Sequence, residues 1–223
     1  MKKIKGSFLI LIFSLFISQN IHAQSPQWHS DKKIAVVFGL TQPVALSGFN
    51  LEVNYIYRRF VFDYSHGMSL DFQGNLLPDY LRNQGVEVYM PFSTGFGIGY
   101  RLTEWLNLRV ESKWHSFEFY YKGEPQTAFN RVAADPNNYS VGLGVYGFFQ
   151  PFKKKGNVLK GVTVAPSIRF WPTVDTRFDN NRFHYQNRNT GSNEQLKTLA
   201  SGIKFSPLII NASIGYTFNL KKT

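Results

Sequence analysis

The chain has 223 residues, of which 43% are hydrophobic and 17% aromatic, and its formal net charge is +11. This length suits a single domain or one closed sheet of about 200 residues. Because the chain contains no cysteine, it can form neither a disulfide framework nor a thiolate metal site. A high aromatic content with a mean hydropathy of only −0.23 is typical of strands in which apolar and polar residues alternate.

An export signal is predicted at residues 1–23. Three lysines among the first five residues form a positive segment, and a ten-residue apolar run follows at 8–17. Ala23 is the small residue that a signal peptidase requires, so we expect cleavage before Gln24. The apolar run is well below the roughly 20 residues of a membrane-spanning helix. The mature chain, residues 24–223, then carries a net charge of +8 (11 − 3).

Eight strands are predicted from the alternation of apolar and polar residues. They are expected at residues 34–40, 49–57, 60–65, 92–101, 106–114, 139–149, 162–171 and 208–218. Pro166 cannot donate a hydrogen bond to a strand ladder, so we expect a bulge at that point. The strand at 106–114 shows the pattern most clearly, because its alternate residues are apolar on one face and charged on the other.

Apart from a lysine-rich turn of medium length at 150–161, the connections between these strands alternate in length. Arg58 and Arg59 leave room only for a tight turn, and residues 102–105 form another short one, whereas long loops are expected at 68–90, at 121–138 and over the 35 or so residues before the last strand. Up-and-down transmembrane barrels have short periplasmic turns and longer extracellular loops. A Greek-key sandwich gives no such alternation. The sequence therefore predicts an all-β, up-and-down antiparallel transmembrane β-barrel of eight strands.

The last strand contains Ser213-Ile214-Gly215-Tyr216-Thr217-Phe218. This polar, glycine and aromatic-x-aromatic order is the arrangement of the C-terminal assembly signal of outer-membrane barrels. In this respect the sequence resembles the small eight-stranded outer-membrane proteins of the OmpA/OmpX type, in the porin-like superfamily of Gram-negative bacteria. The resemblance implies location in the outer membrane and contact with its lipid and lipopolysaccharide. It also implies that the barrel-assembly machinery recognises Gly215, Tyr216 and Phe218.

The charged face of residues 106–114 must point into the barrel, because an Arg or Lys at the bilayer midplane costs about 2–4 kcal/mol. The interior of an eight-stranded barrel is only wide enough for side chains to fill it. We therefore expect a plugged, salt-bridged lumen, with a narrow ion path as the alternative. The residues expected in this polar lumen network are Glu52, Asp63, Arg101, Arg109, Glu111, Lys113, His115 and Arg169.

Two serine–histidine pairs are possible catalytic groups. Ser65 and His66, like His115 and Ser116, are adjacent in the sequence. Adjacent strand residues point to opposite faces, so neither pair can act as nucleophile and base within its own strand. No histidine and carboxylate spacing resembles a metal site. We therefore predict no enzymatic activity, no catalytic or metal-binding residue and no cofactor.

Between the last two strands, arginine and aromatic residues alternate around an Asn180-Asn181 turn. We interpret this segment as a hairpin above the membrane, whose arginines face lipopolysaccharide phosphates or the acidic groups of a protein partner. The alternative is an ordinary exposed hairpin with nothing specific to bind. Export argues against nucleic acid as the partner. The candidate contact residues are Arg177, Phe178, Arg182, Phe183, Tyr185 and Arg188.

Two classes of function remain open. The first is a non-enzymatic outer-membrane barrel with a structural, adhesive or envelope-assembly role; a lipid-modifying enzyme is a variant of it. The second is a soluble periplasmic or secreted β-barrel that binds an apolar ligand, as lipocalins do. The aromatic face points outward in the first class and inward in the second. The charges at 106–114 and the aromatic last strand favour the first class.

Overall fold

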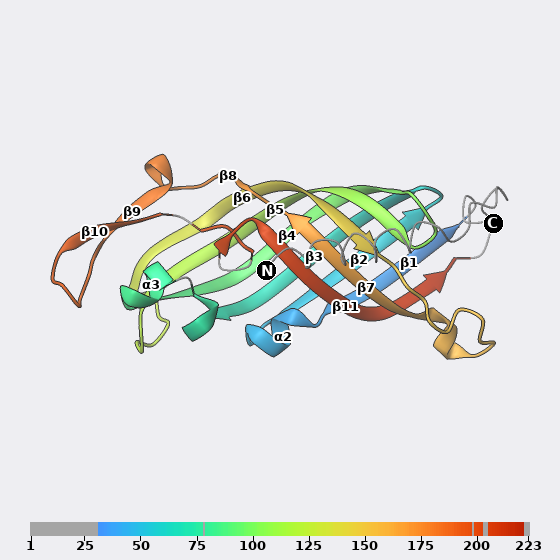
Figure 1. Cartoon of the computed structure of the whole chain (residues 1–223), viewed down its shortest axis with the longest axis horizontal. Helices are drawn as coiled ribbons and strands as arrows, with labels where there is room; N and C mark the ends of the chain where they lie inside the picture. The colour runs from blue at the N-terminus through green and yellow to red at the C-terminus, as the bar shows by residue number, and fades with distance from the viewer. Residues whose placement is uncertain (1–30, 78, 198, 203–204, 221–223) are drawn as a thin grey trace, which may run out of the picture.

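The computed structural model describes residues 31–77, 79–197, 199–202 and 205–220, so the predicted export signal lies outside the described residues. Eight antiparallel strands form a closed ring in the order β1-β2-β3-β4-β5-β6-β7-β11, with β11 paired to β1 (Figure 1). Their bounds are β1 Lys32–Gly39, β2 Phe49–Tyr57, β3 Phe60–Phe72, β4 Val86–Arg101, β5 Leu106–Tyr121, β6 Arg131–Gly147, β7 Val162–Phe170 and β11 Leu208–Asn219. The predicted eight-stranded up-and-down barrel is confirmed.

Short elements occupy the connections. They are α2 Thr41–Ala45, η2 Gly74–Leu76, α3 Asp79–Asn83, η3 Val158–Gly161, β8 Thr173–Asp175, η4 Asp179–Asn181, β9 Arg182–Gln186 and β10 Asn193–Lys197. Within the described residues, no helix has the length and apolar composition needed to cross a membrane.

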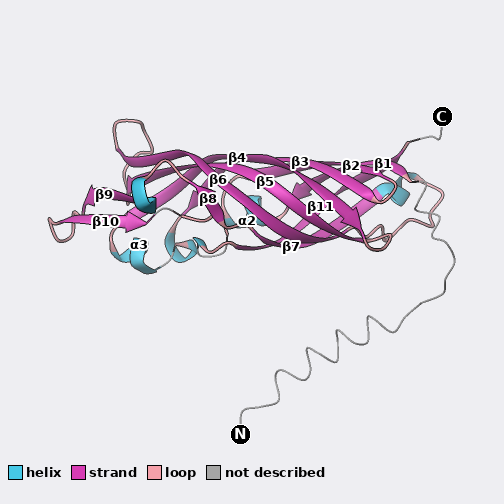
Figure 2. Ribbon diagram, turned by 90° about the horizontal axis from the view of Figure 1, so that it is seen from above, coloured by secondary structure: helices cyan, strands magenta, loops and turns pink. Residues whose placement is uncertain are grey.

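The two ends of the barrel differ (Figure 2). At one end, called here the turn end, lie the turns β2–β3, β4–β5 and β6–β7, together with the beginning of β1 and the end of β11. Leu220 N–H donates to Lys32 C=O there at 2.8 Å. The opposite end, called here the loop end, carries α3 and the β9–β10 hairpin, whereas α2, in the β1–β2 connection on the same side, lies nearer the middle of the barrel. The length alternation of the connections therefore follows from a simple up-and-down order.

Four neighbouring strands, β3 to β6, extend beyond the rest of the ring at the loop end. They have 13 to 17 residues, whereas β1, β2 and β7 have eight or nine. This corrects the sequence interpretation of 68–90 and 121–138 as loops, because β3 runs to Phe72, β4 starts at Val86 and β6 starts at Arg131.

The extended parts escaped prediction because the pattern inverts there. Nearer the turn end, the buried residues of β3 include Asp63 and Ser65. Beyond Ser69, which has a φ of 56°, the buried residues of β3 are Leu70 and Phe72. The β4–β5 register also shifts between Tyr89 and Ser93. Such irregularities are bulges, which change the face on which the following residues lie. On the loop-end side of these bulges, apolar residues point inward, as they do in a protein surrounded by water.

These inward apolar residues form one cluster, called here the apolar cap. Its members are Leu70, Phe72, Leu77, Leu81, Val86, Val88, Met90, Phe117, Phe119, Phe183, Tyr185, Leu196, Leu199 and Phe205. The cluster is built from β3, β4 and β5 on one side and from α3 and the β9–β10 hairpin on the other. Burial of apolar side chains at about 25 cal/mol per Å² holds these connections against the barrel.

The structure corrects the expected centre of this hairpin. Asn180 and Asn181 have positive φ angles, but they lie in η4, before the first hairpin strand. The hairpin pairs β9 with β10, from Arg182 opposite Lys197 to Gln186 opposite Asn193. The bulge expected at Pro166 is also absent from the β7–β11 ladder, which runs through Pro166 opposite Ala212 without a shift. On its other side the β6–β7 ladder stops at Ser167, so no ladder bond is required from Pro166.

Candidate functional site: the polar lumen network

Arg109 lies at the centre of the barrel interior. Its Nη1 donates to Glu52 Oε1 at 2.7 Å and lies 3.3 Å from Asp63 Oδ1. Its guanidinium also lies 3.8 Å from the centroid of the Tyr146 ring. These partners come from β2, β3 and β6, so one side chain on β5 links three other strands of the ring.

Glu111, two residues further along β5, is the second centre. Its Oε2 accepts hydrogen bonds from the Tyr146 hydroxyl at 2.5 Å and from Trp171 Nε1 at 2.9 Å. Its Oε1 lies 3.6 Å from Lys113 Nζ, which also donates to Ser65 Oγ. All of these side chains except Trp171 and Ser65 are 1% exposed. A buried charge is costly unless it is paired, and Glu111 and Lys113 pair with each other. Each also has a hydrogen bond, Glu111 at Oε2 from Tyr146 and Lys113 at Nζ to Ser65.

Arg169 completes the network from β7. Its Nη2 lies 3.6 Å from Glu52 Oε2, and its Nε donates to Ser167 Oγ at 3.0 Å. The network thus contains three cations and three anions, all buried: Arg109, Lys113 and Arg169 with Glu52, Asp63 and Glu111. The charges of these six side chains balance.

Two of the eight residues expected in this network lie apart from its centre. Arg101 binds Asp31 Oδ2 at 3.2 Å at the turn end, where Lys33 shares the same carboxylate at 2.9 Å. His115 lies on the loop-end side, and its Nδ1 is 2.8 Å from Ser93 Oγ.

Two aromatic members of the network were missed in the sequence analysis, Tyr146 and Trp171. Both occupy space that a neighbouring glycine provides. A Cβ at Gly144 would lie 2.5 Å from Tyr146 Cε2, and a Cβ at Gly142 would lie 2.6 Å from Trp171 Cδ1. The alternation of glycine with apolar residues in β6 was the available signal, because it predicts large side chains reaching across the interior.

The Ser93–His115 contact was also missed, because it joins neighbouring strands rather than neighbouring residues. The β4–β5 register places these two residues directly opposite each other. Within the described residues, His115 Nε2 has no hydrogen-bond partner. The described residues also contain no group of three or more His, Asp or Glu side chains placed to hold a metal ion.

The outer surface of the barrel decides which environment surrounds it. Large apolar side chains on the outward face are around half exposed on neighbouring strands; they include Phe62, Phe96, Ile98, Val110, Leu143 and Ile168. A continuous apolar belt around a charged interior is stable only in hydrocarbon, where strand pairing around a closed ring satisfies the backbone. The chain is a transmembrane β-barrel.

This barrel is of the outer-membrane type, with strands of alternating polarity and apolar residues on the lipid side. The fold places the protein in the outer membrane. The soluble, lipocalin-like alternative is excluded, because that class requires the aromatic face to point inward, whereas Phe62 and Phe96 point outward.

No protein-family model and no curated protein matches the sequence. Among solved structures, the chain is similar to the attachment invasion locus protein Ail of Yersinia pestis, with a TM-score of 0.41, 12% identity and coverage of 84% of this chain and 99% of that one. Ail in complex with the heparin analogue sucrose octasulfate gives 0.38, with the same identity and coverage. A major outer membrane protein from Thermus thermophilus gives 0.42, at 12% identity, with 85% and 100% covered.

The candidate contact residues between β7 and β11 divide into two groups. Phe183 and Tyr185 are buried in the apolar cap, and Phe178 packs against it, so these aromatic side chains support the fold of the loop end. Burial, with a hydrogen bond to Glu194 Oε2 at 3.1 Å, raises the pKa of Tyr185 to about 12. The arginines Arg177, Arg182 and Arg188 are exposed; Arg188 pairs with Glu124 and lies over the Tyr121 ring.

The residues of the predicted assembly signal lie on β11, which closes the ring. Phe218 is exposed on the lipid side opposite Ile34, and its ring centroid lies 4.7 Å from that of Tyr216. Gly215 makes room for β1, since a Cβ there would lie 2.0 Å from the carbonyl oxygen of Val36. Thr217 points inward, with its Oγ1 2.7 Å from Thr163 Oγ1.

Proposed function

We propose that the protein is a non-enzymatic outer-membrane barrel with a sealed lumen, which anchors and displays the apolar cap and its loops at the cell surface in a structural, adhesive or envelope-assembly role. The balanced ion-pair network carries this proposal. One cavity reaches the network from the loop end, lined in part by Arg169 and Trp171, and another lies at the turn end beside Arg101 and Lys33. In this proposal the buried side chains of Arg109, Glu111 and Tyr146 form the barrier between the two cavities.

Orientation is part of the proposal. Outer-membrane barrels have short periplasmic turns and long extracellular loops. The turn end then faces the periplasm, and the loop end, with the apolar cap, faces the outside. The loop-end parts of β3 to β6 have inward apolar residues, as expected for segments in water. This supports the orientation, because those parts would lie outside the bilayer.

A solute-flux assay tests the sealed lumen. Proteoliposomes containing the barrel should swell in a small-sugar solution no faster than protein-free liposomes. The matched control is the triple variant Glu52→Ala, Arg109→Ala, Tyr146→Ala, which removes one anion, one cation and a large ring while keeping the charges balanced. This variant, checked for folding by its gel mobility, should admit the sugar. Flux through the unaltered barrel above the liposome background would show that the lumen conducts, and would overturn the proposal.

We further propose that the exposed arginines of the loop end contact lipopolysaccharide phosphates or an acidic protein partner. Within the described residues, neither Arg177 nor Arg182 forms an ion pair, whereas Arg188 is engaged by Glu124. The double variant Arg177→Ser, Arg182→Ser should retain less lipopolysaccharide after purification, most clearly at low salt, where charges are least screened.

The charge-matched control for that variant is Lys154→Ser, Lys155→Ser at the turn end, which should retain lipopolysaccharide as the unaltered protein does. Equal retention by both double variants would remove the arginines from the proposal and leave the loop end as plain surface.

A further inference from the structure

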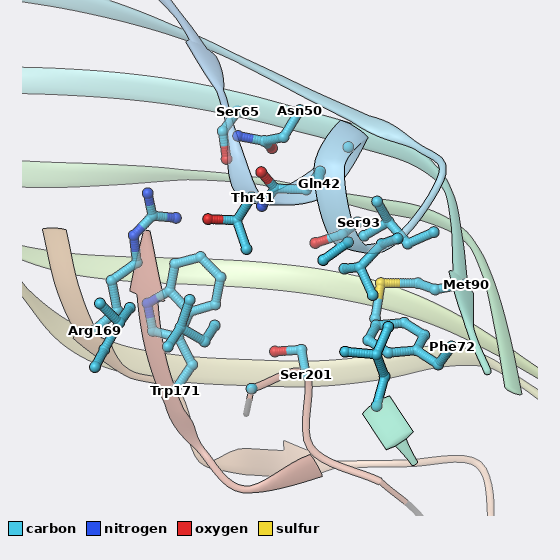
Figure 3. Close-up of a pocket in the computed structure, with 18 residues that line it drawn as sticks. Thr41, Gln42, Asn50, Ser65, Phe72, Met90, Ser93, Arg169, Trp171 and Ser201 are labelled. Atoms are coloured by element: carbon cyan, nitrogen blue, oxygen red, sulfur yellow. The ribbon is translucent and has the colours of Figure 1, made fainter. Parts of the chain in front are cut away.

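A cavity of about 300 Å³ lies inside the barrel on the loop-end side of the ion-pair network. Figure 3 shows its two contrasting ends. Arg169, Asn50 and Gln42 contribute polar groups near the network, whereas Phe72 and Met90 form an apolar end toward the cap. Its volume is at the lower limit of the range found for small-molecule sites. A compartment of this shape matches an amphiphile with one polar head and one hydrocarbon chain.

The barrel wall is incomplete beside this cavity. β1 ends at Gly39, which pairs with Ser213. Residues 208–211 of β11 therefore pair with β7 on one side and, among the described residues, with no strand on the other. The helix α2 lies at this gap and contacts both β2 and β11 (Figure 1). Backbone groups left without ladder partners make such a place easier to open than a paired wall.

The gap connects the cavity with the lipid side of the barrel. Ile210, on the outward face of β11, lines the cavity and is 54% exposed. Ala45 of α2 also lines it, and the adjacent Val44 is 85% exposed. An apolar chain that enters at the gap would therefore contact the apolar side chains of Ile210 and Ala45.

Three polar atoms of cavity-lining residues are buried and, within the described residues, have no hydrogen-bond partner. They are Asn50 Nδ2, Gln42 Oε1 and Ser201 Oγ. Asn50 itself is more than nine-tenths buried. A buried polar group without a partner is costly, so these atoms favour a ligand that supplies one. Together they offer a hydrogen-bond donor, a hydrogen-bond acceptor and a hydroxyl. These groups suit a polar head that both accepts and donates hydrogen bonds.

Charge balance decides the class of that head. Arg169 borders the cavity, but its charge is already matched by Glu52 at 3.6 Å within a network of three cations and three anions. A carboxylate or phosphate would add an unbalanced charge to a confined interior, where that is unfavourable. An uncharged head can accept a hydrogen bond from Asn50 or Arg169 and donate one to Gln42. It adds no unbalanced charge to the interior.

We propose that this cavity binds an uncharged single-chain amphiphile with a hydroxyl or amide head, taken up from the outer leaflet through the gap beside α2. The head lies against Asn50 and Gln42, and the chain lies against Leu70, Phe72 and Met90.

The two methionines after residue 1 allow a direct test. Met90 lines the cavity and is 1% exposed, whereas Met68 is 40% exposed on the lipid side. In phospholipid nanodiscs, with both methyl groups isotope-labelled for NMR, 1-decanol should shift the Met90 signal to saturation. The Met68 signal should change only in proportion to the decanol in the membrane. Parallel, unsaturated changes at both methyl groups would overturn the proposal.

The head is tested with two further probes. Decane lacks a polar head, and decanoate, at a pH where it is ionised, carries a charge. Each should bind at Met90 about tenfold more weakly than 1-decanol, which is the fold-change expected for one lost hydrogen bond or one uncompensated charge. Decanoate binding as tightly as 1-decanol would disprove the uncharged head. The Asn50→Leu variant should bind 1-decanol about tenfold more weakly and should bind decane with unchanged affinity.

A matched pair of variants tests the route. Ala45→Phe places a ring at the mouth of the cavity and should abolish the Met90 response. Val44→Phe adds a side chain to the neighbouring, outward position of the same helix and should preserve the response. Gel mobility and the unperturbed Met68 signal show that both variants fold. An equal response in the two variants would mean that the ligand does not pass beside α2.

Discussion

Glu111 shows how much of the barrel depends on single side chains. It accepts hydrogen bonds from Tyr146 and Trp171 and lies 3.6 Å from Lys113 Nζ. Its two hydrogen-bond donors come from β6 and from the residue after β7. One carboxylate thus organises the interior contacts of three neighbouring wall segments, and its loss leaves cations and donors without their acceptor.

We expect Glu111→Ala to lower the free energy of unfolding by about 3–5 kcal/mol, the cost of breaking a buried ion pair from one side. Ser112→Ala is the control, since Ser112 Oγ bonds only Tyr139 OH, at 2.8 Å, among the hydrogen bonds described. Loss of this hydrogen bond should lower the free energy of unfolding by about 1 kcal/mol. Denaturant unfolding in phospholipid vesicles, followed by tryptophan fluorescence, measures both. A larger loss for Ser112→Ala would contradict the assignment of the two faces.

The raised pKa of Tyr185 predicts that the effect of pH on stability is confined to the loop end. Burial raises its pKa from 10.0 to about 12, so the folded cap holds the neutral phenol more tightly than the unfolded chain does. The resulting stabilisation is fully present below pH 10 and is lost as the pH rises through about 12. Near-ultraviolet circular dichroism should therefore show the aromatic signal of the cap falling between these values. Tyr185→Phe should reduce that fall; an unchanged fall would assign it to other groups.

At the scale of elements, β11 has the task of closing the ring between β1 and β7. Its outward residues meet lipid and its inward residues meet the polar interior, so the two faces should respond differently to truncation. Full burial of a Phe side chain contributes about 1.5–3 kcal/mol. Phe218 lies on the lipid side, and Thr217 lies on the inner side with its hydroxyl near Thr163.

We therefore expect Phe218→Ala to reduce the inserted, heat-modifiable fraction several-fold, with a similar loss for Tyr216→Ala. Thr217→Val keeps the shape of the side chain, and Thr163 retains its bond to Gly161 C=O at 2.9 Å, so its effect should be mild. Comparing heated and unheated samples on detergent gels after a pulse of synthesis gives the fractions. Equal loss in all three variants would show that assembly does not distinguish the faces of β11.

At the scale of the whole molecule, the two ends of the barrel should be accessible from opposite sides of the membrane. Arg177, Arg182 and Arg188 are exposed at the loop end, and Lys154 and Lys155 are exposed in the β6–β7 connection at the turn end. Trypsin cuts exposed loops first. Protease access therefore reports the orientation independently of any partner.

Trypsin added to intact cells should cut near Arg182 and spare residues 153–155, which should become accessible only after the outer membrane is permeabilised. Mass spectrometry of the fragments identifies the sites. Replacing Arg182 by serine should remove its own cleavage product without changing cutting at the turn end. Rapid cutting at 153–155 in intact cells would reverse the orientation of the barrel.

The sequence by itself determined the number, order and approximate bounds of the membrane strands. In hydrocarbon the polarity of each residue reports the face on which it lies, so a local pattern such as Leu106, Arg109, Val110 and Glu111 is sufficient to predict a strand and its two faces. The alternation of short and long connections then predicts the up-and-down order. Both signals are local, and the fold follows from them.

Only the tertiary structure decided which of these residues meet. Arg109 reaches Glu52, which is 57 residues away in the chain, and Ser93 reaches His115 through strand register. Bulges shift the face of β3 and β4, so the apolar cap follows a pattern opposite to that of the membrane strands and resembled a loop in the sequence. The cavity beside α2 depends on where β1 stops relative to β11. These features arise from pairing between distant segments, because the packing of a closed ring is set by all eight strands together.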